Sequence, residues 1–310
     1  MTRALGFFAS ALTLTALLHA AAARAQTPPA PKPTLKDVAY GQHPRQRLDV
    51  YRARSDRPAP VLFYVHGGGW MQGDKNTPDF LVPCLKSGVS VVSIDYRLIP
   101  DAIAQGVTPP VKACLDDTAR ALQFVRSHAA DWNIDKERIT GCGGSAGGFN
   151  TLWLAFHPDL ADPGSDDPVA RESTRLRCAV AFVPQTSLDP VQMRSWIPNV
   201  NYGHHAFALS NFQQFVDRRA ELLKWIEDYS PYALATSDDP PVYLYYDSAP
   251  GLGQPCKDPP HSANFGAGLV ERLKAVGIEH EFNYPGAPDV KHPDIFSFLT
   301  EKLQASGAGK

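Results

Sequence analysis

Short runs of apolar residues alternate with longer segments in which apolar positions recur at helical spacing. Runs bounded by Gly and Pro predict buried strands, and the segments between them predict helices. This alternation is typical of an α/β fold, with a mainly parallel sheet and helices on both faces. The expected strands are residues 61–65, 90–94, 138–142, 178–183, 242–246 and 280–284, preceded by an antiparallel edge at 37–41 and 47–52. The expected helices are residues 77–86, 111–130, 146–157, 211–228, 263–276 and 293–304.

Residues 188–237 interrupt the alternation, because they contain no clear strand. We expect this segment to be a helical cap insertion over the carboxyl edge of the sheet, where open α/β sheets bind ligands. A helical excursion with its own small core is the alternative. The pair His204–His205 could bind a substrate carboxylate or a metal, but we expect these histidines to be solvated. Aromatic residues of the segment could stack on a substrate or fill the cap: Trp196, Tyr202, Phe207, Phe212 and Phe215.

The first residues are typical of a signal peptide, which we assign to residues 1–25. Arg3 gives the positive start, residues 5–18 give an uncharged apolar run, and small residues precede the expected cleavage site. Residues 26–33 form a Pro-rich linker, so the expected domain, one large α/β domain, covers residues 34–305. We expect an exported protein, periplasmic or secreted, without stable membrane insertion after cleavage; a retained membrane anchor is the alternative.

Charge and cysteine content narrow the classes of partner. The formal net charge is −2 and no basic stripe occurs, so nucleic acid is not an expected partner. Five cysteines are an odd number, and although one disulfide could form, no dense framework is visible. No C-x-x-C or H-E-x-x-H spacing occurs, and we expect neither a metal nor an organic cofactor.

The stretch ITGCGGSAGGFN places Ser145 among glycines, between an expected strand and an expected helix. Gly143, Ser145 and Gly147 fit the G-x-S-x-G pattern of a nucleophile elbow. Such a turn strains the serine backbone, and side chains two residues to either side would collide. The helix that follows places N–H groups and the positive end of its dipole beside a developing anion. We predict Ser145 as a nucleophile; a glycine-rich turn with an incidental serine is the alternative.

The stretch VHGGGW, residues 65–70, follows the first buried strand and predicts a second part of the same site. Its glycines let the backbone approach a ligand, so that N–H groups can stabilise the oxyanion of a tetrahedral acyl intermediate. The candidate donors are Gly67 and Gly68, together with the N–H of Ala146. We expect His66 to brace this loop rather than act as a base. The candidate substrate-binding residues are Trp70, Trp196 and Tyr202.

A serine nucleophile needs a histidine to take its proton and a carboxylate to orient that histidine. In an elbow of this type, the acid and then the base follow the serine in the chain. Three histidines follow the cap: His261 near a helix start, His280 within a strand pattern and His292 after the last strand. We predict His292 as the base, because the segment before the last helix can reach across the sheet edge.

The acid is expected on a loop after the strand at 242–246. We favour Asp258 over Asp247, because Asp258 directly precedes the next helix on a loop that can reach the histidine. Asp247 could instead close the strand or cap the turn. Asp289 and Asp294 are weaker candidates, since they are sequence neighbours of the predicted base.

These motifs resemble α/β-hydrolases of the carboxylesterase/lipase type. The chain is similar to hormone-sensitive-lipase-like esterases and to the carbohydrate-esterase branch that includes feruloyl and acetylxylan esterases. The matching stretches are VHGGGW, SIDYRL, NIDKERITGCGGSAGG and DPPHSANFGAGLVERLKAVGIEHEFNYPGA, in the family's order. The resemblance implies an eight-stranded α/β-hydrolase fold with Ser145 as nucleophile, Asp258 as acid, His292 as base, and Gly67, Gly68 and Ala146 as oxyanion donors.

Three stretches of the chain depart from the lipase-like pattern. Gly144 stands where an acidic residue usually precedes the nucleophile, and residues 99–101 replace the usual Ala-Pro-Glu. Pro293 and Asp294 follow the predicted base, where Gly-Phe is common. These departures favour the carbohydrate-esterase-like branch.

We therefore expect an exported serine esterase that acts on a small-molecule ester substrate through an acyl-enzyme intermediate. Small acyl esters and aryl or carbohydrate-linked esters are the expected substrates, while acyl length, alcohol and oligomeric state stay open. A serine peptidase of the prolyl-oligopeptidase type is one alternative, although the chain has no room for a propeller-sized domain. A non-catalytic binding protein on a hydrolase scaffold is the other.

Overall fold

A computed structural model describes residues 31–75, 78, 80–288 and 290–304. The predicted signal peptide, most of the predicted linker and Asp289 therefore lie outside the described residues. No helix among the described residues is both long and apolar enough to span a bilayer.

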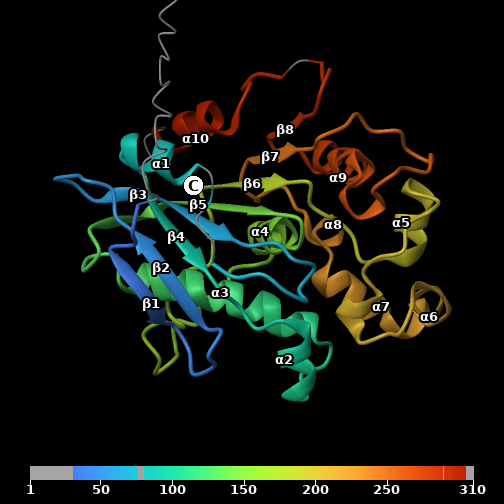
Figure 1. Ribbon diagram of the computed structural model, residues 1–310, viewed down its shortest axis with the longest axis horizontal. Helices are drawn as coiled ribbons and strands as arrows, with labels where there is room; N and C mark the ends of the chain where they lie inside the picture. The colour runs from blue at the N-terminus through green and yellow to red at the C-terminus, as the bar shows by residue number, and fades with distance from the viewer. Residues whose placement is uncertain (1–30, 76–77, 79, 289, 305–310) are drawn as a thin grey trace, which may run out of the picture. The chain divides into compact units, whose positions relative to one another are not determined.

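An eight-stranded sheet forms the centre of the described chain (Figure 1). Its strands lie in the order β1-β2-β4-β3-β5-β6-β7-β8. Near one edge, β2 pairs antiparallel with both β1 and β4, and all other neighbouring strands pair in parallel. This sheet confirms the predicted architecture, including the antiparallel edge. The strands are β1 (Leu35–Ala39), β2 (Arg47–Tyr51), β3 (Ala59–Val65), β4 (Ser90–Ile94), β5 (Ile134–Gly144), β6 (Cys178–Phe182), β7 (Val242–Tyr245) and β8 (His280–Asn283).

Helices cover both faces of this sheet. Helices α1 and α10 pack on one face, and α3, α4 and α9 pack on the other (Figure 1). The helices are α1 (Leu81–Lys86), α2 (Ile99–Ala104), α3 (Val111–Ser127), α4 (Ala146–Phe156), α5 (Pro190–Trp196), α6 (Phe212–Asp217), α7 (Arg219–Tyr229), α8 (Pro231–Leu234), α9 (Ala263–Val276) and α10 (Ile295–Gln304). Two short 3₁₀ turns are η1 (His204–Phe207) and η2 (Pro259–His261).

The continuous apolar runs arise because the central strands are buried on both faces. Successive side chains of a strand point to opposite sides. In β3, Val61, Phe63 and Val65 therefore join the core under α3 and α4, whereas Leu62 joins the core under α1 and α10. Both sets are fully buried, so an alternation of apolar and polar residues would leave polar groups in one of the two cores.

The segment between β6 and β7 holds α5, η1, α6, α7 and α8. Its buried aromatics Phe207, Phe212 and Phe215 belong to the same apolar core as the sheet face beneath α3 and α4. These three side chains therefore pack the segment onto the fold. Its role as a cap over bound ligands stays a prediction.

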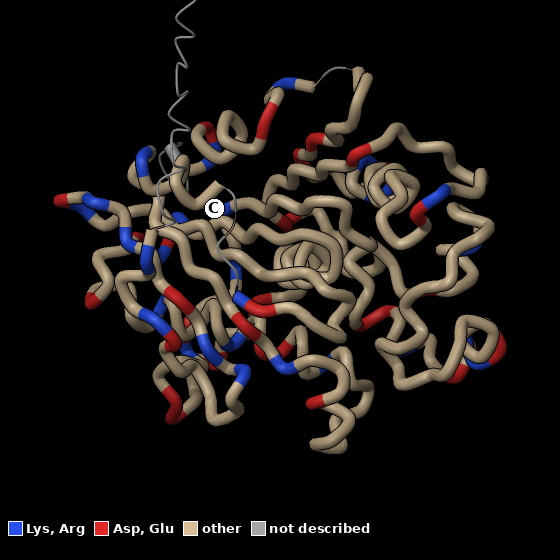
Figure 2. The backbone as a smooth tube through the Cα atoms, in the orientation of Figure 1, with Lys and Arg blue, Asp and Glu red and all other residues tan. Residues whose placement is uncertain are grey.

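Charged residues and cysteines have simple placements. Acidic and basic residues are interspersed over the described backbone, and the middle of the sheet carries few of either (Figure 2). All five cysteines are free thiols. Cys84, Cys142 and Cys178 lie buried in the core beneath α1 and α10, so the thiols act there as small apolar side chains.

Candidate active site

Ser145 occupies the sharp turn between β5 and α4. Its backbone has φ 52° and ψ −125°, a left-handed conformation that costs a non-glycine residue energy. The turn is crowded: a Cβ on Gly143 would lie 2.4 Å from the oxygen of Gly147, and one on Gly147 would lie 2.1 Å from the oxygen of Val65. Glycine is therefore required at both positions, as the elbow pattern predicts. The N–H of Ser145 donates to the oxygen of Phe182 (2.8 Å), which ties the elbow to β6.

A histidine and a carboxylate line up behind this serine. The Oγ of Ser145 lies 2.9 Å from Nε2 of His261, and Nδ1 of His261 lies 2.9 Å from Oδ2 of Asp258. Asp258 directly precedes the 3₁₀ turn η2, which follows β7, and His261 is the last residue of that turn. This is the relay in which a carboxylate orients an imidazole toward a serine hydroxyl. The side chains of His261 and Asp258 are 37% and 66% exposed, so the relay is open to solvent.

The structure corrects the predicted base. His292 lies near α10, where Nδ1 contacts Oε1 of Glu281 and Nε2 lies 3.1 Å from Oε2 of Glu301. Both ring nitrogens are thus engaged with carboxylates, and the side chain is 8% exposed, so it cannot accept the proton of Ser145. The sequence rule says only that the base follows the acid along the chain, and it does not say how far. Here His261, three residues after Asp258, already lies within hydrogen-bond distance of the serine.

The sequence did contain a signal for this arrangement. In the stretch DPPH, residues 258–261, a carboxylate precedes a histidine by three residues, and two prolines lie between them. A 3₁₀ turn places positions i and i+3 on the same side, and proline fixes φ near the helical value. An acid and a base on one short turn can therefore contact each other without a second loop.

Among the candidate acids, Asp258 is the one that contacts the histidine facing Ser145. Asp247 is exposed just after β7. Asp294 accepts from the N–H of Ser297 (2.9 Å) at the start of α10, which is the role of a helix cap.

The loop after β3 lies directly against the elbow. A Cβ on Gly67 would lie 2.8 Å from the oxygen of Gly144 and 3.4 Å from the Cβ of Ser145. Gly68 has φ +110°, which only glycine adopts without strain. Ala146 is the first residue of α4, at the positive end of the helix dipole. The three predicted oxyanion donors thus border the nucleophile, and their role stays a prediction.

His66 supports this loop from within the core. Its Nδ1 lies 2.7 Å from the oxygen of Gly67, and its ring stacks on Tyr96 at 4.4 Å. The hydroxyl of Tyr96 donates to the oxygen of His66 (2.8 Å). Burial lowers the pKa of His66 to about 4, so the ring is neutral at neutral pH and Nδ1–H can donate to the loop. These contacts are those of a brace.

A histidine of the segment between β6 and β7 supports the same loop. Nε2 of His205 lies 3.0 Å from the oxygen of Gly69, and burial lowers the pKa of His205 to about 4. The expectation that this histidine is solvated is therefore wrong. Among the described residues, no group of three or more His, Cys, Asp or Glu side chains could hold a metal ion.

The predicted substrate-binding residues have different environments. Trp70 is fully buried, and its Nε1 donates to Oδ1 of Asn150 (2.8 Å) in the core between α3 and α4. It cannot touch a substrate, which corrects that prediction. Trp196 is half-buried and packs edge-on against Phe265 (6.3 Å). Tyr202 is half-buried, with its hydroxyl oxygen hidden from solvent. Contact of Trp196 or Tyr202 with substrate stays a prediction.

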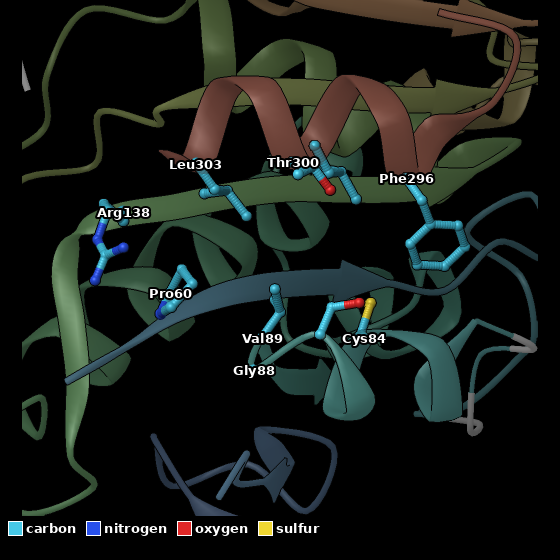
Figure 3. A pocket seen from close by; sticks show the side chains of 10 residues that line it. Pro60, Cys84, Gly88, Val89, Arg138, Phe296, Thr300 and Leu303 are labelled. Carbon is cyan, nitrogen blue, oxygen red and sulfur yellow. The ribbon is translucent and has the colours of Figure 1, made fainter. Parts of the chain in front are cut away.

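A hollow of about 400 Å³ lies between α1 and α10, on the other face of the sheet from α4 (Figure 3). It shares no lining residue with the relay at Ser145. Burial raises the pKa of its thiol, Cys84, to about 12, so this group is not a thiolate at neutral pH. Its lining residues are Pro60, Cys84, Ser87, Gly88, Val89, Arg138, Phe296, Leu299, Thr300 and Leu303.

The chain matches a family model and several known proteins. A model of the family described as BD-FAE matches residues 48–249. Versiconal hemiacetal acetate esterase of Dothistroma septosporum is 32% identical over 154 residues, 49% of this chain and 42% of that protein. The probable carboxylic ester hydrolase LipM of Mycobacterium tuberculosis is 26% identical over 296 residues, 88% of this chain and 62% of that protein. The chain thus spans about half the length of these two relatives.

A solved structure gives the fold. A truncated carbohydrate esterase from gut microbiota superposes with a TM-score of 0.63, covering 87% of this chain and 95% of that chain. The two sequences are 19% identical, so the likeness speaks to fold alone. It confirms the predicted α/β-hydrolase fold.

Proposed function

The chain belongs to the BD-FAE family, and on this premise we propose that it hydrolyses carboxylic esters with Ser145 as nucleophile, His261 as base and Asp258 as acid. The observation that carries the proposal is the relay of two 2.9 Å contacts that ends on a serine in a strained elbow. Strain at a catalytic serine is a cost that a merely structural turn would avoid. The names of the relatives, esterase and carboxylic ester hydrolase, point to the same chemistry.

The reaction runs in two balanced halves. The Oγ of Ser145 bonds to the ester carbonyl carbon while its proton moves to Nε2 of His261, and the carbonyl electron pair moves to oxygen. Collapse of this intermediate breaks the bond to the alcohol oxygen, which leaves with the proton from His261. Water then attacks the acyl-enzyme by the same route and releases the acid and Ser145. The carboxylate of Asp258 orients His261 and stabilises the imidazolium in both halves.

The oxyanion is held by the backbone rather than by side chains. The N–H groups of Gly67, Gly68 and Ala146 are the proposed donors, and α4 adds the positive end of its dipole. Hydrogen bonds from His66 and His205 to carbonyls of the loop fix its shape before substrate arrives. Donors that are already in place need no reorganisation during the reaction.

The proposed substrate is a small-molecule ester, either a small acyl ester or an aryl or carbohydrate-linked ester. The open relay supports this choice, since a group attached to a larger alcohol could approach Ser145 from solvent. Export through residues 1–25 is also proposed. If cleavage follows the predicted site, the protein recovered from the periplasm or medium should have the mass of a chain that begins at Gln26.

The test compares three proteins on p-nitrophenyl acetate, butyrate and octanoate and on methyl ferulate. Wild type should hydrolyse at least one ester, and Ser145→Ala should lose that activity. Ser127→Ala is the matched control, because its hydroxyl bonds a carbonyl of its own helix, α3 (2.8 Å to Phe124). An active Ser145→Ala protein would contradict the nucleophile. A folded wild type that is inactive on all esters would contradict the function.

A further inference from the structure

One short segment is hydrogen-bonded both to the turn that carries the proposed nucleophile and to the turn that carries the proposed base. The segment 182–185, which we name the β6 exit segment, begins at the last residue of β6, at the carboxyl edge of the sheet. Its first residue, Phe182, accepts the backbone N–H of Ser145 (2.8 Å). Its last residue, Gln185, donates from Nε2 to the oxygen of Pro260 (2.5 Å). Pro260 lies in η2, between Asp258 and His261.

The β6 exit segment is itself strained and firmly held. Val183 has φ 42°, and a β-branched residue in this region is an outlier that its surroundings must enforce. The N–H of Val183 donates to the oxygen of Tyr245 (2.7 Å), and the hydroxyl of Tyr246 donates to the oxygen of Pro184 (2.7 Å). The end of β7 therefore fixes this backbone, and with it the direction in which Gln185 points.

Fold stability alone does not account for the glutamine. Gln185 is 0% exposed, and its Oε1 is buried without a partner among the described residues. A buried acceptor without a partner is a cost that an apolar side chain of similar size would avoid. The benefit that remains is the single bond from Nε2 to η2. That turn needs support, because the two side chains of the relay it carries are both partly exposed.

We infer that Gln185 is a positioning residue, which holds η2 so that Nε2 of His261 stays within hydrogen-bond distance of Ser145. The inference rests on the proposed function, since it concerns the geometry of the same relay. Gln185 does not touch the reacting atoms. It acts through the backbone of Pro260. One end of the β6 exit segment is bonded to Ser145 and the other end to η2, so the segment sets the distance between Ser145 and His261.

The test is Gln185→Met, which keeps the volume and removes the amide. Misplacement of a catalytic group by about 1 Å costs on the order of 100-fold in rate, so we expect kcat to fall roughly 10- to 100-fold. KM should change less than about twofold, because no substrate contact is lost. The melting temperature should stay level or rise, because the unpartnered acceptor is gone. The rate at which a p-nitrophenyl phosphonate labels Ser145 should fall by the same factor as kcat.

Gln123→Met is the matched control. Gln123 is also buried, and its Nε2 donates to the oxygens of Ala170 (3.2 Å) and Glu172 (2.8 Å), away from the relay. This variant should melt at a lower temperature and keep the wild-type kcat at 25 °C. Wild-type kcat and labelling rate in Gln185→Met would overturn the inference. Equal losses of activity in both variants would also overturn it, since they would assign Gln185 a structural role only.

The labelling assay separates this inference from the proposed function. If wild type turned over no ester, the function would fail, yet the phosphonate would still report how well His261 activates Ser145. Equal labelling of wild type and Gln185→Met would then overturn the inference, and slower labelling of the variant would support it.

Discussion

The sharpest steric prediction concerns two glycines of the elbow, Gly144 and Gly147. A Cβ on Gly147 would lie 2.1 Å from the oxygen of Val65 and 2.5 Å from that of His66. Carbon–oxygen contacts are ordinarily about 3.3 Å or longer, so the loop after β3 and α4 must separate by roughly 1 Å. Gly144 differs, because its Cβ would meet only Phe182, at 3.8 Å and beyond.

Alanine substitutions at these glycines should therefore give unlike results. Gly147→Ala should lose about 1–3 kcal/mol of stability through overpacking, and the melting temperature should fall about 2–4 °C for each kcal/mol. Its kcat/KM should fall on the order of 100-fold, because the loop moves relative to Ser145. Gly144→Ala should stay close to wild type in both. Ester hydrolysis and thermal melts measure the two effects. A Gly147→Ala protein with wild-type activity and stability, or an inactive Gly144→Ala protein, would refute the steric reasoning.

Three further predictions follow from buried groups. The pKa of His66 is lowered from 6.5 to about 4, so the unfolded chain binds more protons between these values and stability should fall by about 3 kcal/mol as the pH drops from 6.5 to 4. Thermal melts across this range should show a smaller loss in His66→Gln, and an equal loss would contradict the assignment. Trp70→Phe leaves buried Asn150 without its donor and should lower the stability of the fold by about 1–3 kcal/mol, while KM stays unchanged. A raised KM would indicate that Trp70 does contact the substrate. His292→Gln should lower stability, because the single side-chain nitrogen of glutamine cannot contact both Glu281 and Glu301. Its kcat at 25 °C should stay unchanged, and a lowered kcat would indicate that His292 acts in catalysis.

The strands of the sheet could be predicted from the sequence because most of them are buried on both faces. Strands buried on both faces must be apolar throughout, and every expected strand lies within or overlaps a strand of the sheet. Helix α2 was not anticipated, because six residues are too few to show a helical period. The single helix expected over residues 211–228 is divided at Arg218 into α6 and α7. Helical spacing continues across such a break, so the pattern does not reveal it.

The strained elbow at Ser145 and the loop beside it were also predictable from sequence, because close backbone approach demands glycine wherever it occurs. The histidine that faces Ser145 was not, because chain order says which histidines follow Asp258 and not which one lies against the serine. Trp70 was misjudged for a related reason. An aromatic residue next to a functional loop can point into the site or into the core, and the choice depends on Asn150, a partner 80 residues away.

The central claim is that His261, and not His292, activates Ser145. The most direct measurement is kcat/KM for p-nitrophenyl acetate in His261→Ala and His292→Ala, each held well below its melting temperature. Loss of a triad base removes on the order of 10³- to 10⁶-fold of activity. The account predicts a loss of this size in His261→Ala and an activity within a few-fold of wild type in His292→Ala. The reverse result, an active His261→Ala and an inactive His292→Ala, would contradict it.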